Sequence, residues 1–282
     1  MGEQARDRLG RFGIWSSQGS VTPELAAELQ RLGFGTLWVG GSPPGHLEQV
    51  EQLLAVTTTL TLATSIVNMW QDDAHVVAAS FRRIEDRYPG RFVLGVGAGH
   101  REATRHYARP FDTLAAYVDT LLADGVPRDC LVLAALGPRV LRLSAERTAG
   151  ANPYLVPPEY TRQAREVLGA GPLLAPEHKV VLDTDPQRAR ALGRARVRRP
   201  YLGLVNYTSN LRRLGWGDAD LSDGGSDALI DALVAWGTGP QVAARLNEHV
   251  AAGADHVCAQ LLTEDDADPR EGYRQLAAAL GL

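Results

Sequence analysis

Short apolar segments alternate with amphipathic helical segments along almost the whole chain, and this alternation limits the folds that are open to it. Strand-like runs such as 36–39 and 131–135 are each followed by a stretch with apolar residues at helical spacing. Parallel strands need long crossover connections, which are usually helices. The pattern therefore predicts an α/β fold with a parallel sheet.

Eight such strands can be counted, and each is followed by helical sequence. They are expected at residues 12–15, 36–39, 60–69, 92–100, 131–135, 151–156, 179–182 and 257–262. Eight repeated units predict a (β/α)8 barrel that forms a single domain over residues 1–282. Residues 201–227, rich in Gly, Asn, Ser and Asp, break the rhythm and predict a long loop or a helical insertion before the last strand. A helix is expected over 228–236.

A doubly wound sheet is the alternative fold. It would require a glycine-rich turn after the first strand. Here the glycines follow the second, fourth and fifth strands. A ligand site assembled from several strand ends is typical of a barrel, so this distribution favours the barrel.

Composition narrows the class of partner. The net charge of −4 and the dispersed arginines argue against nucleic acid and against an anionic membrane surface, since both attract concentrated basic patches. No apolar run reaches membrane-spanning length, and the N-terminus has no signal-peptide core. The sequence thus predicts a soluble cytoplasmic protein with a small-molecule partner.

The sequence contains two cysteines and a single lysine. Cys130 and Cys258 lie in separate apolar runs without a zinc-ligand spacing, which predicts two buried thiols, no metal site and a reducing compartment. Lys179 is the only lysine beside many arginines, and we attribute this bias to a GC-rich genome and not to function.

The strand at 60–69 has an unusual end. It begins with Leu and β-branched Thr residues suited to a buried strand, and then delivers Ser65 and Asn68 to its C-terminal tip. In parallel α/β folds that tip is where ligands bind. Ser65 is therefore a candidate ligand-facing residue.

Several motifs together resemble the luciferase-like flavin and deazaflavin oxidoreductases, a barrel family that includes bacterial luciferase and enzymes dependent on coenzyme F420. The motifs are LGFGTLWV at 32–39, ATSI at 63–66, LGVGAG at 94–99 and ALGP at 135–138. The resemblance covers nearly the whole chain. It implies a hydride-transferring enzyme that is a homodimer.

The resemblance also implies where the cofactor ring and its phosphate side would lie. The implied cofactor-binding residues stand at the strand ends: Gly41, Ser42, Thr64, Ser65, Ile66, Gly97, Gly99, Ala135, Gly137, Pro138 and Asn152. Relatives place a bulge at the position of Ser65 and Ile66, often with a non-proline cis peptide against the ring. From the residues alone, a regular strand end is the alternative.

The acid–base residues are less clear. Many deazaflavin-dependent relatives carry Asp-His at the tip of the second strand, whereas this chain has Gly40-Gly41 there. His100 stands near the position of a glutamate in some relatives and is the candidate catalytic residue, because imidazole exchanges protons near neutrality. Tyr154 is expected in a surface loop, and Trp15 either in the pocket wall or in the core.

The sequence thus favours an F420-dependent oxidoreductase acting on a small organic substrate. Two alternatives remain open. One is an FMN-dependent monooxygenase of the same family, since the two cofactors share a tricyclic ring and a ribityl phosphate. The other is a barrel that binds such a ligand without turnover, which the missing Asp-His pair would favour.

Overall fold

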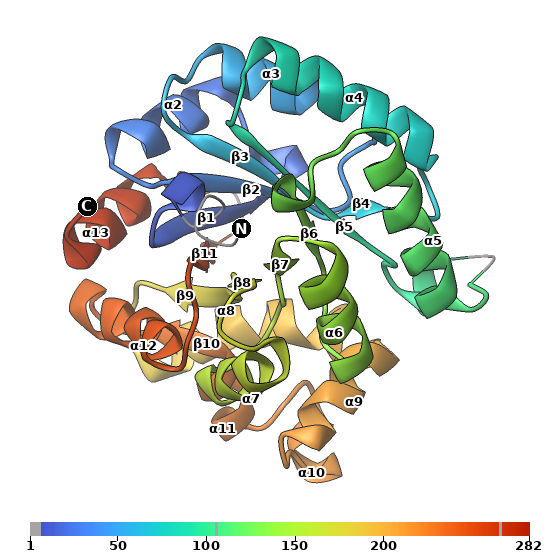
Figure 1. The fold of residues 1–282 in the computed structure, drawn as a ribbon. Helices are drawn as coiled ribbons and strands as arrows, with labels where there is room; N and C mark the ends of the chain where they lie inside the picture. The colour runs from blue at the N-terminus through green and yellow to red at the C-terminus, as the bar shows by residue number, and fades with distance from the viewer. Residues whose placement is uncertain (1–6, 105–106, 265–266) are drawn as a thin grey trace.

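The computed structural model describes residues 7–104, 107–264 and 267–282 and shows a parallel sheet curved into a barrel, with helices around it (Figure 1). The predicted α/β barrel is confirmed. The strands are β1 (Phe12–Ser17), β2 (Thr36–Gly40), β3 (Thr61–Ser65), β4 (Val67–Asn68), β5 (Phe92–Gly97), β6 (Leu131–Leu133), β7 (Gly150–Ala151), β8 (Leu173–Leu174), β9 (Glu177–Val181), β10 (Val234–Trp236) and β11 (Val257–Leu261).

The barrel closes at residues 173–181, where β8 and β9 form one interrupted strand. On one side β8 pairs with β7, and on the other β9 pairs with β11, which returns to β1. Around the break, the Ala175 N–H donates to the Ala151 carbonyl at 2.9 Å and the Cys258 N–H donates to the Pro176 carbonyl at 3.0 Å. The first and last parts of the chain thus share one sheet.

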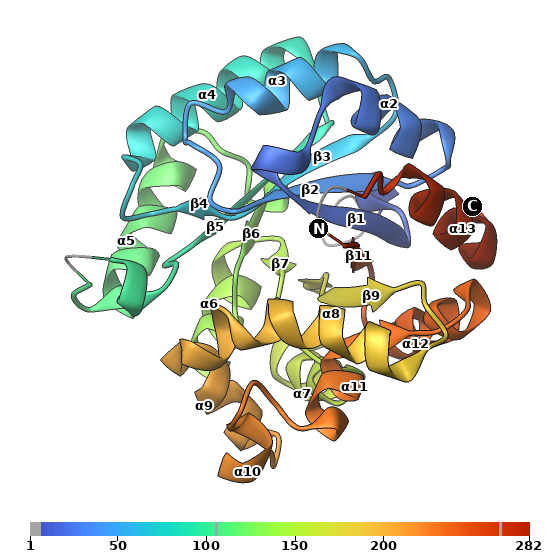
Figure 2. The ribbon, with the colours of Figure 1, turned by 180° about the vertical axis from the view of Figure 1, so that it is seen from behind.

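Helices follow the strands and cover the outside of the barrel (Figures 1 and 2). They begin where the sequence provides caps: the Thr22 hydroxyl accepts the Leu25 N–H at 3.2 Å, and Asp185 accepts N–H groups of the first turn that follows it. The helices are α2 (Pro23–Arg31), α3 (Glu48–Ala55), α4 (Ala74–Arg87), α5 (Pro110–Ala123), α6 (Pro138–Arg147), α7 (Pro158–Leu168), α8 (Pro186–Arg198), α9 (Val205–Arg213), α10 (Asp218–Leu221), α11 (Asp227–Leu233), α12 (Gly239–Ala251) and α13 (Arg270–Leu280).

The core has two layers because successive strand residues point to opposite faces. Leu37 packs outward into the layer between the sheet and the helices, whereas its neighbour Trp38 points into the barrel. Both cysteines are buried, as predicted, with Cys258 in the interior layer.

Three local expectations differ from the structure. The helix predicted over 228–236 stops at Leu233, because the next three residues pair with 179–181 as β10. The sixth strand, predicted at 151–156, is only the two residues of β7. The two-residue β8 was not predicted.

The segment 201–227 does form an insertion before the last strand. It contains the 3-10 helix η4 (Tyr201–Gly203) together with α9 and α10. Figure 2 shows α8, which leads into it, running across the view below β9. The insertion therefore covers part of one end of the barrel.

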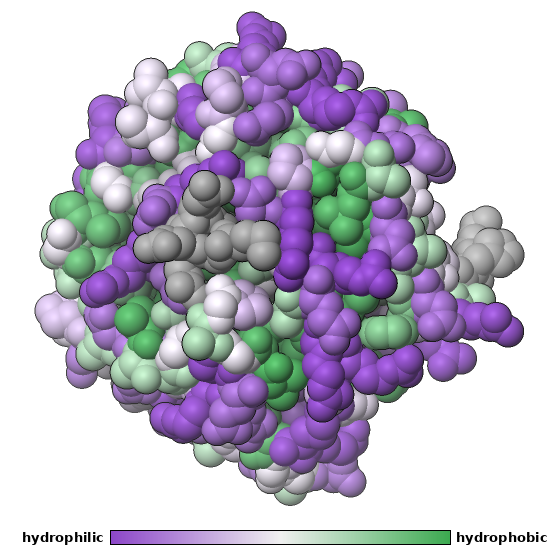
Figure 3. Space-filling model, viewed as in Figure 1, coloured by the Kyte–Doolittle hydropathy of each residue, from purple (hydrophilic) through white to green (hydrophobic). Residues whose placement is uncertain are grey.

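The surface seen in Figure 3 is mostly hydrophilic, with hydrophobic residues in separated groups. Among the residues that the structure describes, no helix is long and apolar enough to span a membrane.

One histidine is built into the barrel wall with a fixed tautomer. His256 Nδ1 lies 2.7 Å from the Gly10 carbonyl, which can only accept, so this nitrogen carries the proton. Its Nε2 then accepts the Trp38 indole N–H at 3.0 Å. Gly13 provides the room, since a Cβ there would lie 2.8 Å from the imidazole.

A second histidine pair lies between β9 and α12. His178 and His249 are fully buried, with their facing nitrogens 3.0 Å apart, and the Thr161 hydroxyl lies 2.7 Å from His249 Nδ1. Burial lowers the pKa of His178 to about 3 and that of His256 to about 4, and it lowers the pKa of His249 well below its ordinary value. All three imidazoles are therefore neutral in the folded protein at neutral pH.

We expect the three buried histidines to make the free energy of unfolding fall at acid pH. Each folded-state pKa lies below the unfolded value of about 6.5, so the stability they contribute is complete above that pH and is lost as the pH falls toward 4. The free energy of unfolding should then decrease by up to about 1.4 kcal/mol per pH unit for each histidine. Urea unfolding at pH 7.5, 6.5 and 5.5 measures it.

A control separates histidine from carboxylate effects. His256→Gln should reduce the pH dependence of the unfolding free energy by about one histidine's share, because it removes one buried imidazole and leaves every carboxylate in place. An unfolding free energy that is constant between pH 6.5 and 5.5 would contradict this account.

Candidate functional site

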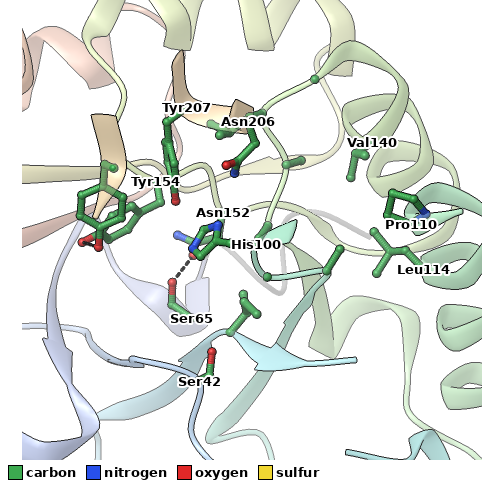
Figure 4. Close-up of a pocket in the computed structure, with 18 of the residues that line it drawn as sticks. Ser42, Ser65, His100, Pro110, Leu114, Val140, Asn152, Tyr154, Asn206 and Tyr207 are labelled. Carbon is green, nitrogen blue, oxygen red and sulfur yellow. Dashed lines mark hydrogen bonds between the residues drawn. The ribbon is translucent and has the colours of Figure 1, made fainter. Parts of the chain in front are cut away.

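A cavity of about 340 Å³ lies where the C-terminal ends of β1, β3, β5, β6 and β7 meet the insertion (Figure 4). We call it the first cavity. Nine of the twelve residues predicted for the site line it: Gly41, Ser42, Ser65, Ile66, Gly99, His100, Ala135, Gly137 and Asn152. Thr64, Gly97 and Pro138 do not.

Ser65 and Asn152 are joined across this cavity. The Ser65 hydroxyl donates to Asn152 Oδ1 at 2.7 Å (Figure 4). Asn152 Nδ2 in turn donates to the Ala175 carbonyl at 2.7 Å. The two bonds fix which way the amide points. They also connect the end of β3 to the closing segment of the barrel.

The strand through Ser65 is interrupted at Ile66. The chain leaves β3 at Ser65 and resumes as β4 at Val67, and the Ser65–Ile66 peptide is cis. The irregular strand end implied by the family resemblance is thus present, and the regular strand end is excluded.

The predicted residues outside the lining support it from behind. The Thr64 hydroxyl donates to the Gly95 carbonyl at 2.9 Å and accepts the Gly95 N–H at 2.8 Å. A Cβ at Gly97 would lie 3.0 Å from Ala134 and 3.2 Å from Ile66, so this glycine allows β5 to pack beside the lining. Pro138 is the first residue of α6.

Gly137 and Gly99 form open parts of the wall. Gly137 has an ordinary φ of −87°, and a Cβ there would meet no atom within 4 Å. Gly99 has a φ of +56° and lies close to the Asn68 amide, which explains why glycine is required there. A ligand therefore has open space beside Gly137.

The loop after β2 forms another edge of the cavity. Gln18 Nε2 donates to the Gly41 carbonyl at 2.6 Å and to the Ser42 carbonyl at 3.2 Å. Trp15 covers Gly40, where a Cβ would lie 1.9 Å from the indole ring. The indole therefore occupies the space of any side chain at Gly40, and the Asp-His pair that the family resemblance implied for this strand tip is absent from it.

His100 is positioned between the strand end and the insertion. Its ring centroid lies 5.6 Å from that of Tyr207, and its Nδ1 is buried without a hydrogen-bond partner among the described residues. Burial lowers the pKa of His100, while the Glu102 carboxylate and a hydrogen bond with Asn206 oppose the shift. The imidazole is thus neutral at neutral pH and can accept a proton.

Aromatic residues that the sequence did not indicate complete the lining. Tyr154, predicted in a surface loop, is instead half-buried and packs in tilted ring contacts against Trp15 at 5.2 Å and Tyr201 at 5.3 Å. Tyr201, Asn206 and Tyr207 all come from the insertion. Burial raises the pKa of Tyr154 and Tyr207 well above the ordinary value, so both remain protonated.

The single lysine lies directly behind these tyrosines. The Lys179 ammonium is fully buried and donates to Glu177 at 3.1 Å and to Gln260 Oε1 at 3.0 Å, with the Tyr154 ring centroid 4.0 Å away. The Tyr154 hydroxyl donates to the same Gln260 oxygen at 2.7 Å. A buried ion pair thus fixes the orientation of Tyr154, a structural role that composition alone did not reveal.

The charge of the first cavity is close to zero. None of its described lining residues is Asp, Glu, Lys or Arg, and its titratable groups are His100 and the tyrosines. Within the described parts of the chain, no cluster of three His, Cys, Asp or Glu side chains could hold a metal ion. The cavity is therefore suited to an uncharged, planar group with hydrogen-bonding edges.

The surroundings of His100 predict the pKa of its imidazole. Its pKa should lie below 6.5, and Glu102→Gln should lower it further, because the carboxylate opposes the effect of burial. Glutamine keeps an acceptor for the Val205 N–H, which Glu102 binds at 3.1 Å. NMR titration of the imidazole, assigned with His100→Gln, measures both values. A pKa above 6.5, or no change in Glu102→Gln, would contradict this description.

Comparisons with known proteins agree with the barrel. Residues 13–123 match the luciferase-like monooxygenase family, which confirms the predicted resemblance over that part of the chain. No curated protein matches the sequence.

Solved structures extend the similarity over the whole fold. An F420-dependent secondary alcohol dehydrogenase with an F420-acetone adduct has a TM-score of 0.71 at 15% identity, covering 96% of this chain and 98% of that chain. A coenzyme F420-dependent tetrahydromethanopterin reductase from Methanopyrus kandleri has a TM-score of 0.70 at 14% identity, with the same coverage. The oxygenating constituent of 3,6-diketocamphane monooxygenase from Pseudomonas putida, in complex with FMN, has a TM-score of 0.68 at 13% identity and covers 95% of each chain.

Proposed function

We propose that this chain, whose residues 13–123 match the luciferase-like monooxygenases, is an oxidoreductase that binds a deazaflavin or flavin ring in the first cavity. The observation that carries the proposal is the convergence of nine predicted residues, from five separate strand ends and loops, on one cavity. Coenzyme F420 is the preferred cofactor and FMN the alternative, because the similar structures include proteins of both kinds.

The lining fits such a ring. Ile66, Gly99, Ala135 and Gly137 offer small or flat surfaces, and Gly137 leaves room that a Cβ would fill. Ser65, Asn152 and the tyrosine hydroxyls offer hydrogen bonds at the edges. The bound ring would supply hydride transfer.

The protein's own contribution is orientation and proton handling. Ser65 and Asn152 would fix one edge of the ligand, while the aromatic residues exclude water. His100, neutral and facing the cavity, is the residue proposed to accept or return a proton at its imidazole. The Gly40-Gly41 tip at β2 has no group for this task.

Cofactor preference is tested by mixing the purified protein separately with F420 and with FMN and following fluorescence quenching. We expect saturable binding of F420 that is tighter than binding of FMN. The reverse order would assign the chain to the flavin alternative. Binding of neither would overturn the proposal, and binding without turnover of any substrate tested would favour a non-catalytic barrel.

The location of the ligand is tested by filling the cavity. Gly137→Trp should reduce cofactor affinity at least tenfold, because the new side chain enters open space at a position with ordinary φ. Gly171→Trp is the matched control, because it adds the same group in open space at an exposed loop away from the cavity. Calorimetry of both variants measures affinity, and thermal melting checks the fold. Equal affinities would show that the ligand binds elsewhere.

A further inference from the structure

A second cavity of about 550 Å³ adjoins the first, and the proposed function does not use it. The two cavities share three lining residues, Trp15, Tyr154 and Tyr201. The Tyr201 hydroxyl donates to the Tyr154 hydroxyl at 2.9 Å, so the two tyrosines form a continuous aromatic surface between the cavities. A ligand in one cavity would therefore lie close to a ligand in the other.

The two cavities differ in charge. The described lining of the first has no Asp, Glu, Lys or Arg, whereas the second is lined by Lys179, Arg196 and Arg199. The acidic side chain in its described lining is Glu264, whose charge lies close enough to Arg188 to raise the pKa of that guanidinium. The basic side chains thus lie at the second cavity, where the charge of Lys179 is paired with Glu177 and the two arginines are further cations.

The basic residues lie at different depths. Lys179 is fully buried and paired with Glu177, whereas Arg196 and Arg199 are exposed near the end of α8, where that helix crosses the barrel (Figure 2). Burial is the main cause that lowers the pKa of Lys179 and raises that of Tyr201 to about 12, and the charge of Arg196 reaches both groups from the surface, where it acts to lower each pKa slightly. A negative group entering the cavity would meet this field from the mouth inward.

The remaining walls describe the rest of the ligand. Leu261, Leu262 and Tyr273 give apolar surface, and hydroxyls of Ser17 and Thr263 lie near the rim. This combination fits a molecule with an apolar body and one acidic end.

We propose that the second cavity binds the anionic end of the second reactant, an organic carboxylate, sulfonate or phosphate with an apolar body that extends toward the shared tyrosines. This inference rests on the proposed function, which places the cofactor ring in the first cavity. Arg199 is the specificity-determining residue at the mouth.

The test uses two fluorescent probes that differ in charge. 1-Anilinonaphthalene-8-sulfonate is an aromatic anion, and N-phenyl-1-naphthylamine is its neutral counterpart. Arg199→Gln should weaken sulfonate binding at least threefold, most strongly at low salt, and leave the neutral probe unchanged. Arg198→Gln is the matched control. It removes the same charge from an adjacent residue outside the lining, which packs near Gly224, and should change neither probe.

Cofactor titrations distinguish this inference from the proposed function. Saturating F420 or FMN should leave the sulfonate bound, and Arg199→Gln should leave cofactor affinity within twofold. Displacement of the sulfonate, or a cofactor affinity lowered by Arg199→Gln alone, would assign the anion to the cofactor's own phosphate-bearing chain and overturn the inference. Equal effects of Arg198→Gln and Arg199→Gln, or no sulfonate binding, would overturn it as well. If neither cofactor binds, the proposed function fails, while the Arg199 dependence is still measured.

Discussion

The structure depends on the interrupted strand at 173–181, because this segment closes the barrel. It pairs with β7 through its first residues and with β11 through its last, and so it connects the two ends of the curved sheet. The Asn152 amide shows the consequence directly, since it binds Ser65 on one side and the Ala175 carbonyl of the closing segment on the other.

The same strand brings three ionisable residues into the protein interior. Because side chains alternate along a strand, Glu177 and Lys179 point into the barrel while His178 points toward α12. Inside, the ion pair compensates two charges that would each be costly alone, and outside, the histidine remains neutral. The buried lysine thus belongs to the closing strand and to the wall of the second cavity together.

Sequence patterns predicted the fold well where a segment was long and regular. The apolar runs of β2 and β5 were clear, whereas β7 and β8 have two residues each, too few to show a strand periodicity. The helix predicted over 228–236 was too long for a similar reason. Residues Val234–Trp236 form a strand because they pair with β9, and this pairing cannot be recognised from the local sequence. At the site, the resemblance indicated strand-end glycines, but Tyr201 and Tyr207 reach the cavity through tertiary packing of an insertion without periodicity.

The tip of β2 links the barrel to its chemistry. Gly40 has no side chain and Trp15 fills the space above it, so the first cavity lacks ionised groups in its described lining and keeps His100 and tyrosine hydroxyls as its polar set. Burial keeps the tyrosines protonated and the histidine neutral. The neutral first cavity and the basic second cavity are therefore suited to different ligands. The first can surround a planar ring, while the second attracts a charged partner to its edge, and the shared tyrosines bring the two ligands within reach of each other.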